Sequence, residues 1–230
     1  MQIKNPFRDL TRFEWGLWLT SLVVVGASFL LIPEKDYLTL CASLIGVTAL
    51  IFVAKGYVIG QVLCVVFAVF YGIISFYFRY YGEMVTYLCM TAPVSICSVI
   101  SWLRNPYAKT AEVRVHRMTR GQMLGAMALT VLVSVAFYFI LDWLNTANLL
   151  VSTLSVATSF LASYLTFRRS PYYAVAYAAN DVVLIVLWVL ASVADPAYIP
   201  MILCFVMFLI NDLYGFFQWS RMQKRQEAQR

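Results

Sequence analysis

Eight long apolar stretches, separated by short polar connections, constrain the fold of this chain more than any other feature. Each is about 18–23 residues long, and an α-helix needs about 20 apolar residues to cross the hydrocarbon core of a bilayer. Charged residues make up only 12% of the 230 residues, against roughly 25% in a soluble globular chain. The sequence therefore predicts an all-α polytopic membrane protein, with no room for a separate water-soluble catalytic domain.

The order of the stretches predicts an internal organisation. The expected spans are residues 14–32, 37–54, 57–78, 83–103, 121–143, 147–167, 171–192 and 198–219. Spans two to four and six to eight form two triplets with one helix between them, so both triplets enter the membrane in the same sense. We expect these parts in chain order: an extra first helix (14–32), a three-helix bundle (37–103), a linking helix (121–143), a second three-helix bundle (147–219) and a basic tail (220–230).

The distribution of positive charge predicts the orientation. Fifteen of the 17 Lys and Arg residues fall on the side of the N-terminus, and only Lys35 and Arg79 fall on the opposite side. Cytoplasmic loops are enriched in Lys and Arg, so we expect both termini in the cytoplasm. The basic segment 104–120 is expected to face anionic lipid headgroups, and no nucleic-acid partner is expected. Near the span ends lie Trp15, Trp18, Trp102, Trp143 and Trp219, as expected of interfacial aromatic belts.

Polar side chains within the spans are the candidates for function, because an ionisable residue at mid-span costs about 2.5–3.5 kcal/mol on insertion scales. Asp181 and Asn180 lie near the middle of the seventh span and share one helical face with Tyr177 and Trp188. The candidates from the other spans are Asn211 and Tyr214 in the eighth, Gln61 in the third and Tyr87 in the fourth. Such a set of carboxylate, amides and aromatic rings suits a flat polar ligand, and a cationic one in particular.

A structural interpretation of the same residues stays open. Asn and Gln in membrane bundles often only join helices, at roughly 0.6 kcal/mol per bond. We expect Asp212 to face the cytoplasmic boundary and to pair with Arg221 or Lys224. With no second deep carboxylate beside Asp181 and no phosphate-binding Gly-x-x-x-x-Gly-Lys loop, the sequence predicts transport that needs neither an ion gradient nor ATP.

Several chemistries lack their residues. The single histidine, His116, lies in a basic connection, which argues against haem ligation and zinc hydrolysis by paired histidines. The five cysteines lie in apolar stretches without a CxxC or CxxH pair, so we expect no metal and no cofactor. An intramembrane aspartyl protease built on Asp181 and Asp212 would also need a Gly-x-Gly-Asp turn, which is absent from the sequence.

The span order, Asn180-Asp181 in the middle helix of the second triplet, and the closing run Asn211-Asp-Leu-Tyr-Gly-Phe-Phe-Gln-Trp219 resemble the PnuC family of nicotinamide riboside transporters. The resemblance covers roughly residues 37–222, and the first span looks like an addition. It implies a SWEET-like arrangement of two parallel three-helix bundles in a bacterial inner membrane. It also implies facilitated diffusion of a ribonucleoside with a cationic pyridinium ring, which a cytosolic kinase then traps as the phosphate.

Alternatives remain at this stage. The chain could carry another small polar solute, such as a sugar or a different vitamin, or be an intramembrane enzyme or a structural membrane subunit. The first triplet departs from the resemblance, because Ala68 occupies the position that matches Asp181. The sequence leaves homo-oligomerisation open.

Overall fold

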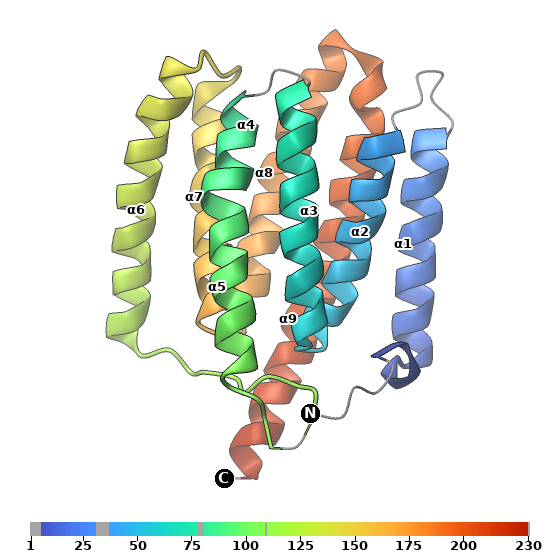
Figure 1. Cartoon of the computed structure of the whole chain (residues 1–230), viewed down its shortest axis with the longest axis vertical. Coiled ribbons are helices and arrows are strands. Elements are labelled where there is room, and N and C mark those ends of the chain that lie inside the picture. Colours follow the sequence, from blue (N-terminus) through green and yellow to red (C-terminus); the bar gives the residue numbers. More distant parts are fainter. Residues whose placement is uncertain (1–5, 31–36, 78–80, 109, 230) are drawn as a thin grey trace.

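The computed structural model describes residues 6–30, 37–77, 81–108 and 110–229. Helices dominate this part of the chain, in line with the predicted all-α class (Figure 1). The long helices are α1 (Arg12–Leu30), α2 (Tyr37–Ala54), α3 (Val58–Tyr77), α5 (Ala92–Leu103), α6 (Arg120–Trp143), α7 (Leu149–Phe167), α8 (Tyr173–Ala194) and α9 (Ile199–Ala228). The shorter elements are η1 (Pro6–Asp9), α4 (Tyr81–Val85), η2 (Thr86–Thr91) and η3 (Pro196–Tyr198).

Eight helical segments in the described residues are long and apolar enough to cross a membrane, when α4, η2 and α5 count as one span. This confirms the eight expected spans. The even number agrees with Figure 1, in which α1 begins and α9 ends at the same end of the bundle. Of the residues behind the charge asymmetry, five lie outside the described part of the chain: Lys4, Lys35, Arg79, Lys109 and Arg230.

Neighbouring helices pack in chain order within each expected triplet. Helix α2 packs on α3 and α3 on α5, while α7 packs on α8 and α8 on α9. The two sets meet where α2 contacts α9 and where α5 contacts α7. Helix α1 packs against α2 and α9, and α6 packs against α7. Helices α1 and α6 therefore flank the bundle (Figure 1), and its division into two parallel triplets stays a prediction.

The fourth span contains a π-helical turn, η2, between α4 and α5. Pro93 has no amide hydrogen to continue an α-helical ladder. Just before it, the Ala92 N–H donates to the carbonyl oxygen of Tyr87, five residues back. Such turns occur frequently at functional sites. This one carries Tyr87, a predicted site residue.

Helix α9 continues to Ala228, so most of the expected basic tail is helical. The side chain of Gln226 accepts from the Val115 N–H at 2.9 Å and donates to the Val113 carbonyl at 3.1 Å. Arg225 forms an ion pair with Glu112. The segment 104–120, expected to face lipid headgroups, thus packs partly on the end of α9, and Val113 is buried beneath it.

Two of the expected interfacial tryptophans are instead buried. The Trp102 indole donates to the Thr166 carbonyl at 3.0 Å, and the Trp219 indole donates to the Val53 carbonyl at 2.8 Å. Their rings lie 5.4 Å apart between centroids. The sequence interpretation was wrong here, because free carbonyls at helix ends can satisfy an indole N–H inside the bundle as well as water can.

Candidate functional site: cavities along the helix α8

Three adjoining cavities follow α8 from one end of the bundle to its middle. The distal cavity lies at the end opposite the start of α1 and is lined by residues of α4, the α6–α7 connection and α8. The second cavity, which we call the neck, shares the lining residues Glu83, Thr146 and Ser152 with the distal cavity. The third, which we call the central cavity, shares Tyr87, Asn180 and Leu184 with the neck. Of the described residues, none lines both the distal and the central cavity.

Six of the spans contribute to the central cavity, and they are the six of the two expected triplets. Among the residues that line it, none comes from α1 or α6 within the described chain. Its polar and aromatic lining includes Gln61, Tyr87, Thr91, Ser95, Ser159, Tyr173, Tyr177, Asn180, Asp181 and Asp212. The structure therefore brings five predicted site residues together: Gln61, Tyr87, Tyr177, Asn180 and Asp181.

Asp181 faces a second carboxyl group, that of Asp212 on α9. The two side chains interact electrostatically, are 3% and 4% exposed respectively, and both line the central cavity. Two buried carboxylates that face each other repel, which disfavours ionisation of both at once, and a proton shared between them would leave the pair with one negative charge. Among the described residues no donor reaches Asp181 Oδ2.

This pair corrects two expectations from the sequence. Asp212 was expected to face the cytoplasmic boundary, and no second deep carboxylate was expected beside Asp181. The helical face of Asp212 depends on how α9 is rotated against α8, and the packing of these two helices turns it inward. The adjacent Asn211 faces a different neighbour.

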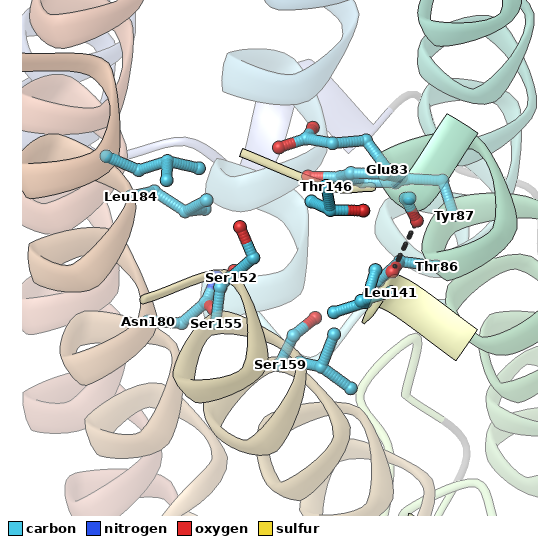
Figure 2. A pocket seen from close by; sticks show the side chains of 13 residues that line it. Glu83, Thr86, Tyr87, Leu141, Thr146, Ser152, Ser155, Ser159, Asn180 and Leu184 are labelled. Carbon is cyan, nitrogen blue, oxygen red and sulfur yellow. Dashed lines mark hydrogen bonds between the residues drawn. The ribbon is translucent and has the colours of Figure 1, made fainter. Parts of the chain in front are cut away.

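Asn180 is held by α7. Its carbonyl oxygen accepts from the Thr158 hydroxyl at 2.9 Å and from Ser155 at 3.5 Å. The amide nitrogen is the group that remains to donate to a ligand. Figure 2 shows Asn180 beside Ser155 in the neck, with Glu83 and Thr146 higher in the same view.

Aromatic side chains form one wall of the central cavity. The ring centroids of Tyr71 and Tyr87 lie 4.5 Å apart, and Phe67 meets Tyr87 at 6.1 Å and Phe208 at 6.0 Å. On α8, the Tyr177 hydroxyl pairs with Ser163 at 3.0 Å. Rings in this arrangement can stack on a flat heteroaromatic ligand and attract a cation.

Three predicted site residues lie outside the central cavity. Trp188 lines the distal cavity. Asn211 donates to the Ser21 hydroxyl of α1 at 3.0 Å and to the Met207 carbonyl at 2.8 Å. The Tyr214 hydroxyl donates to Glu14 of α1 at 2.9 Å. Asn211 and Tyr214 thus join α9 to α1.

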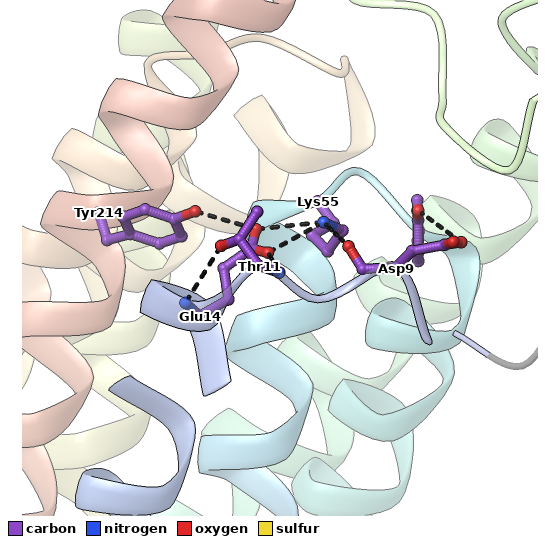
Figure 3. A network of polar contacts seen from close by, with 6 residues as sticks. Asp9, Thr11, Glu14, Lys55 and Tyr214 are labelled. Atoms are coloured by element: carbon purple, nitrogen blue, oxygen red, sulfur yellow. Dashed lines mark hydrogen bonds and ion pairs between the residues drawn. The ribbon is translucent and has the colours of Figure 1, made fainter. Parts of the chain in front are cut away.

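Sequence reasoning treated Glu14 only as the start of a span, yet it is fully buried and central to a polar network (Figure 3). Its carboxylate accepts from the Thr11 N–H at 2.6 Å and forms an ion pair with Lys55 at 3.1 Å. Lys55 also donates to the Asp9 carbonyl at 2.7 Å. An acidic residue in the first turn of an otherwise apolar helix was the available signal.

Comparisons with known proteins agree on one family. The family model described as "Nicotinamide mononucleotide transporter" matches residues 36–221. The chain is 26% identical over 234 residues to the nicotinamide riboside transporter PnuC of Neisseria mucosa, covering 98% of this chain and 88% of that protein. It also matches the crystal structure of the vitamin B3 transporter PnuC, with a TM-score of 0.82, 26% identity and 94% of each chain covered. This integral membrane protein therefore belongs to the PnuC family of transporters.

Proposed function

We propose that the chain carries nicotinamide riboside across the membrane by facilitated diffusion, with the central cavity as its binding site. Membership of a transporter family and the relative named as a nicotinamide riboside transporter support this transport function. The family also speaks against the enzyme alternative, because a carrier returns its solute unchanged.

The charge of the cavity lining is the observation that favours one substrate, the riboside, over the other, the mononucleotide. The three cavities are lined by Asp181, Asp212 and Glu83, and no Lys, Arg or His lines them within the described residues. The riboside has a cationic pyridinium ring and no other charge, whereas the mononucleotide adds a phosphate. A phosphate buried without a cationic partner is strongly disfavoured. The lining therefore favours the riboside over the mononucleotide that gives the family its description.

The substrate fits the individual groups of the central cavity. The pyridinium ring packs against Tyr87 and the neighbouring rings, with the Asp181–Asp212 pair as its counter-charge. The Asn180 amide nitrogen donates to the carboxamide or to a ribose hydroxyl. Gln61 and Tyr177 provide further polar contacts around the sugar.

Binding requires the helices to separate. The central cavity measures about 80 Å³ and the neck about 30 Å³, whereas small-molecule sites typically enclose ≈ 300–1,000 Å³. In the proposed cycle, one set of helices rocks against the other and opens the site to each side in turn. The π-helical turn η2 is a natural point of flexure.

The same electrostatics support trapping by a cytosolic kinase. Phosphorylation converts a cation that the acidic lining accepts into an anion that it rejects. Net flux is then inward without any energy source in the carrier. We expect the cytosolic side to be that of both termini, in a bacterial inner membrane; a reporter fused after Arg230 and found outside the cell would contradict this orientation.

Proton-coupled exchange is the second candidate function, and the Asp181–Asp212 pair favours it. If the entering cation displaced the shared proton, an imposed pH gradient would drive accumulation. Facilitated diffusion instead predicts that labelled riboside equilibrates across proteoliposome membranes and never exceeds the external concentration. Proteoliposomes without a kinase, with and without a pH gradient, separate the two.

Substrate choice is tested by binding to the purified protein. We expect riboside to bind at least roughly 100-fold more tightly than mononucleotide, since an unpaired buried charge costs more than ~2.7 kcal/mol. Sugars and other vitamins serve as competitors, and analysis of the recovered ligand tests for chemical conversion. Equal affinity for the mononucleotide, or tighter binding of a competitor, would contradict the proposal.

A further inference from the structure

The distal cavity is the largest of the three, at about 280 Å³. That is close to the ≈ 300 Å³ at which small-molecule pockets begin, whereas the neck and central cavities are far smaller. The distal cavity therefore has nearly the volume that a small-molecule ligand needs, whereas the Asp181–Asp212 pair lines the central cavity.

Unpartnered polar groups line the distal cavity. Trp188 is only 8% exposed, and its indole Nε1 has no acceptor among the described residues. The Thr146 hydroxyl is likewise buried without a partner there. Leaving such groups unpaired costs about 1–3 kcal/mol each, so both are suited to bond a polar ligand.

Glu83 provides the charge. Its carboxylate is the one charged side chain that lines the distal cavity in the described part of the chain, and Tyr71 bonds to it. Glu83 also lines the neck, at the boundary between the two cavities (Figure 2). The Trp188 ring, which lines the same cavity, rests on Tyr198, with 5.4 Å between centroids.

We propose that the distal cavity is a second binding site, which takes a cationic heteroaromatic ring linked to a sugar before it passes the neck. Glu83 pairs with the cation, the face of Trp188 packs on the ring, and the Trp188 N–H and Thr146 hydroxyl bond the sugar hydroxyls. This site rests on the proposed function, because it takes the same substrate class. It differs from the central site in using neither Asn180 nor Asp181.

A thiol at the rim can report occupancy. Ala147 lines the distal cavity and is exposed, so the Ala147→Cys variant offers a small reporter that is none of the proposed ligands. The probe is nicotinamide riboside, added while a membrane-impermeant thiol reagent labels the variant in proteoliposomes. The parent protein, with its five native cysteines, gives the background.

The design separates the two sites by pairing the reporter with one further change. Adding Asn180→Ala to Ala147→Cys should change the riboside concentration that gives half-maximal protection by no more than about twofold. Asn180 is none of the proposed distal ligands, so its effect on the distal site should be small. Adding Glu83→Gln should raise that concentration by about tenfold, which corresponds to ~1.4 kcal/mol. Asp142→Asn is the matched control, because Asp142 is an exposed carboxylate at the same end of the bundle and lines none of the three cavities.

The outcomes are distinct. Protection that weakens with Asn180→Ala but not with Glu83→Gln would overturn the distal site and leave the central site as the only one. Absence of protection in an Ala147→Cys variant that still transports riboside would also overturn it. Failure of the parent to take up riboside would instead contradict the proposed function, while labelling would still report whether riboside occupies the distal cavity.

Discussion

Two buried carboxylates, Glu14 and Asp181, lie in opposite kinds of surroundings. Glu14 is fully buried and accepts from the Thr11 N–H, the Tyr214 hydroxyl and the Lys55 ammonium. Asp181 is 3% exposed, yet it faces another carboxyl group and has an oxygen that no described residue reaches. The two carboxylates are thus buried to a similar degree, but Glu14 has a complete set of hydrogen-bond partners and Asp181 does not. We interpret the first as a structural joint and the second as a place for a ligand.

The largest expected effect concerns the joint. Lys55→Met leaves Glu14 without its ion pair, and breaking a buried pair costs about 3–5 kcal/mol. We expect the lower end, about 3 kcal/mol, because Thr11 and Tyr214 still donate. Unfolding in a denaturing detergent measures the loss. Lys224→Met, which removes an exposed cation of α9, is the control, and equal stability of the two variants would show that the joint contributes nothing.

The cavity side of the comparison predicts a charge effect. Asp212→Asn keeps one ionisable carboxylate in the pair, so riboside affinity should stay within about threefold. The double change Asp181→Asn with Asp212→Asn removes the charge and should weaken binding by at least about tenfold, or ~1.4 kcal/mol. Titration of the purified variants with riboside measures both. A double variant that binds like the parent would refute the counter-charge role.

Two asparagines sharpen the contrast, because one lies in each region. Asn180→Ala removes a donor from the cavity and should weaken riboside binding by about 1–3 kcal/mol, roughly five- to 150-fold, with little loss of stability. Asn211→Ala removes the bond to Ser21 of α1 and should lower stability while binding is preserved. Binding assays and unfolding curves on both variants test this, and a reversed pattern would exchange the roles of the two regions.

The smallest effect is expected from Tyr214→Phe. The change deletes one hydrogen bond to Glu14 and keeps the ring contact with Phe13, at 5.3 Å between centroids. A hydrogen bond to a charged group contributes about 1.5–3 kcal/mol, and Lys55 and Thr11 compensate in part. We therefore expect a loss of about 1 kcal/mol in unfolding free energy, with unchanged riboside uptake. Reduced uptake at unchanged stability would move Tyr214 into the transport pathway.

The sequence by itself determined the eight spans and the position of each polar residue along its span. A run of about 20 apolar residues has few alternatives to a membrane helix, and Asp181 lies near the middle of such a run. Residues on one helix, such as Tyr177, Asn180 and Asp181, could be grouped from helical periodicity alone. They do share the central cavity.

Only the tertiary structure decided which helix each polar face meets. Asn211 and Asp212 are adjacent in α9, yet one bonds to α1 and the other faces Asp181 on α8. Trp188 shares a face of α8 with Asp181, but it lies about two turns further along the helix and lines the distal cavity instead. The rotation and spacing of packed helices follow from side-chain interdigitation over many distant residues. A pattern within one helix carries no record of that packing, so it cannot separate a ligand contact from a helix contact.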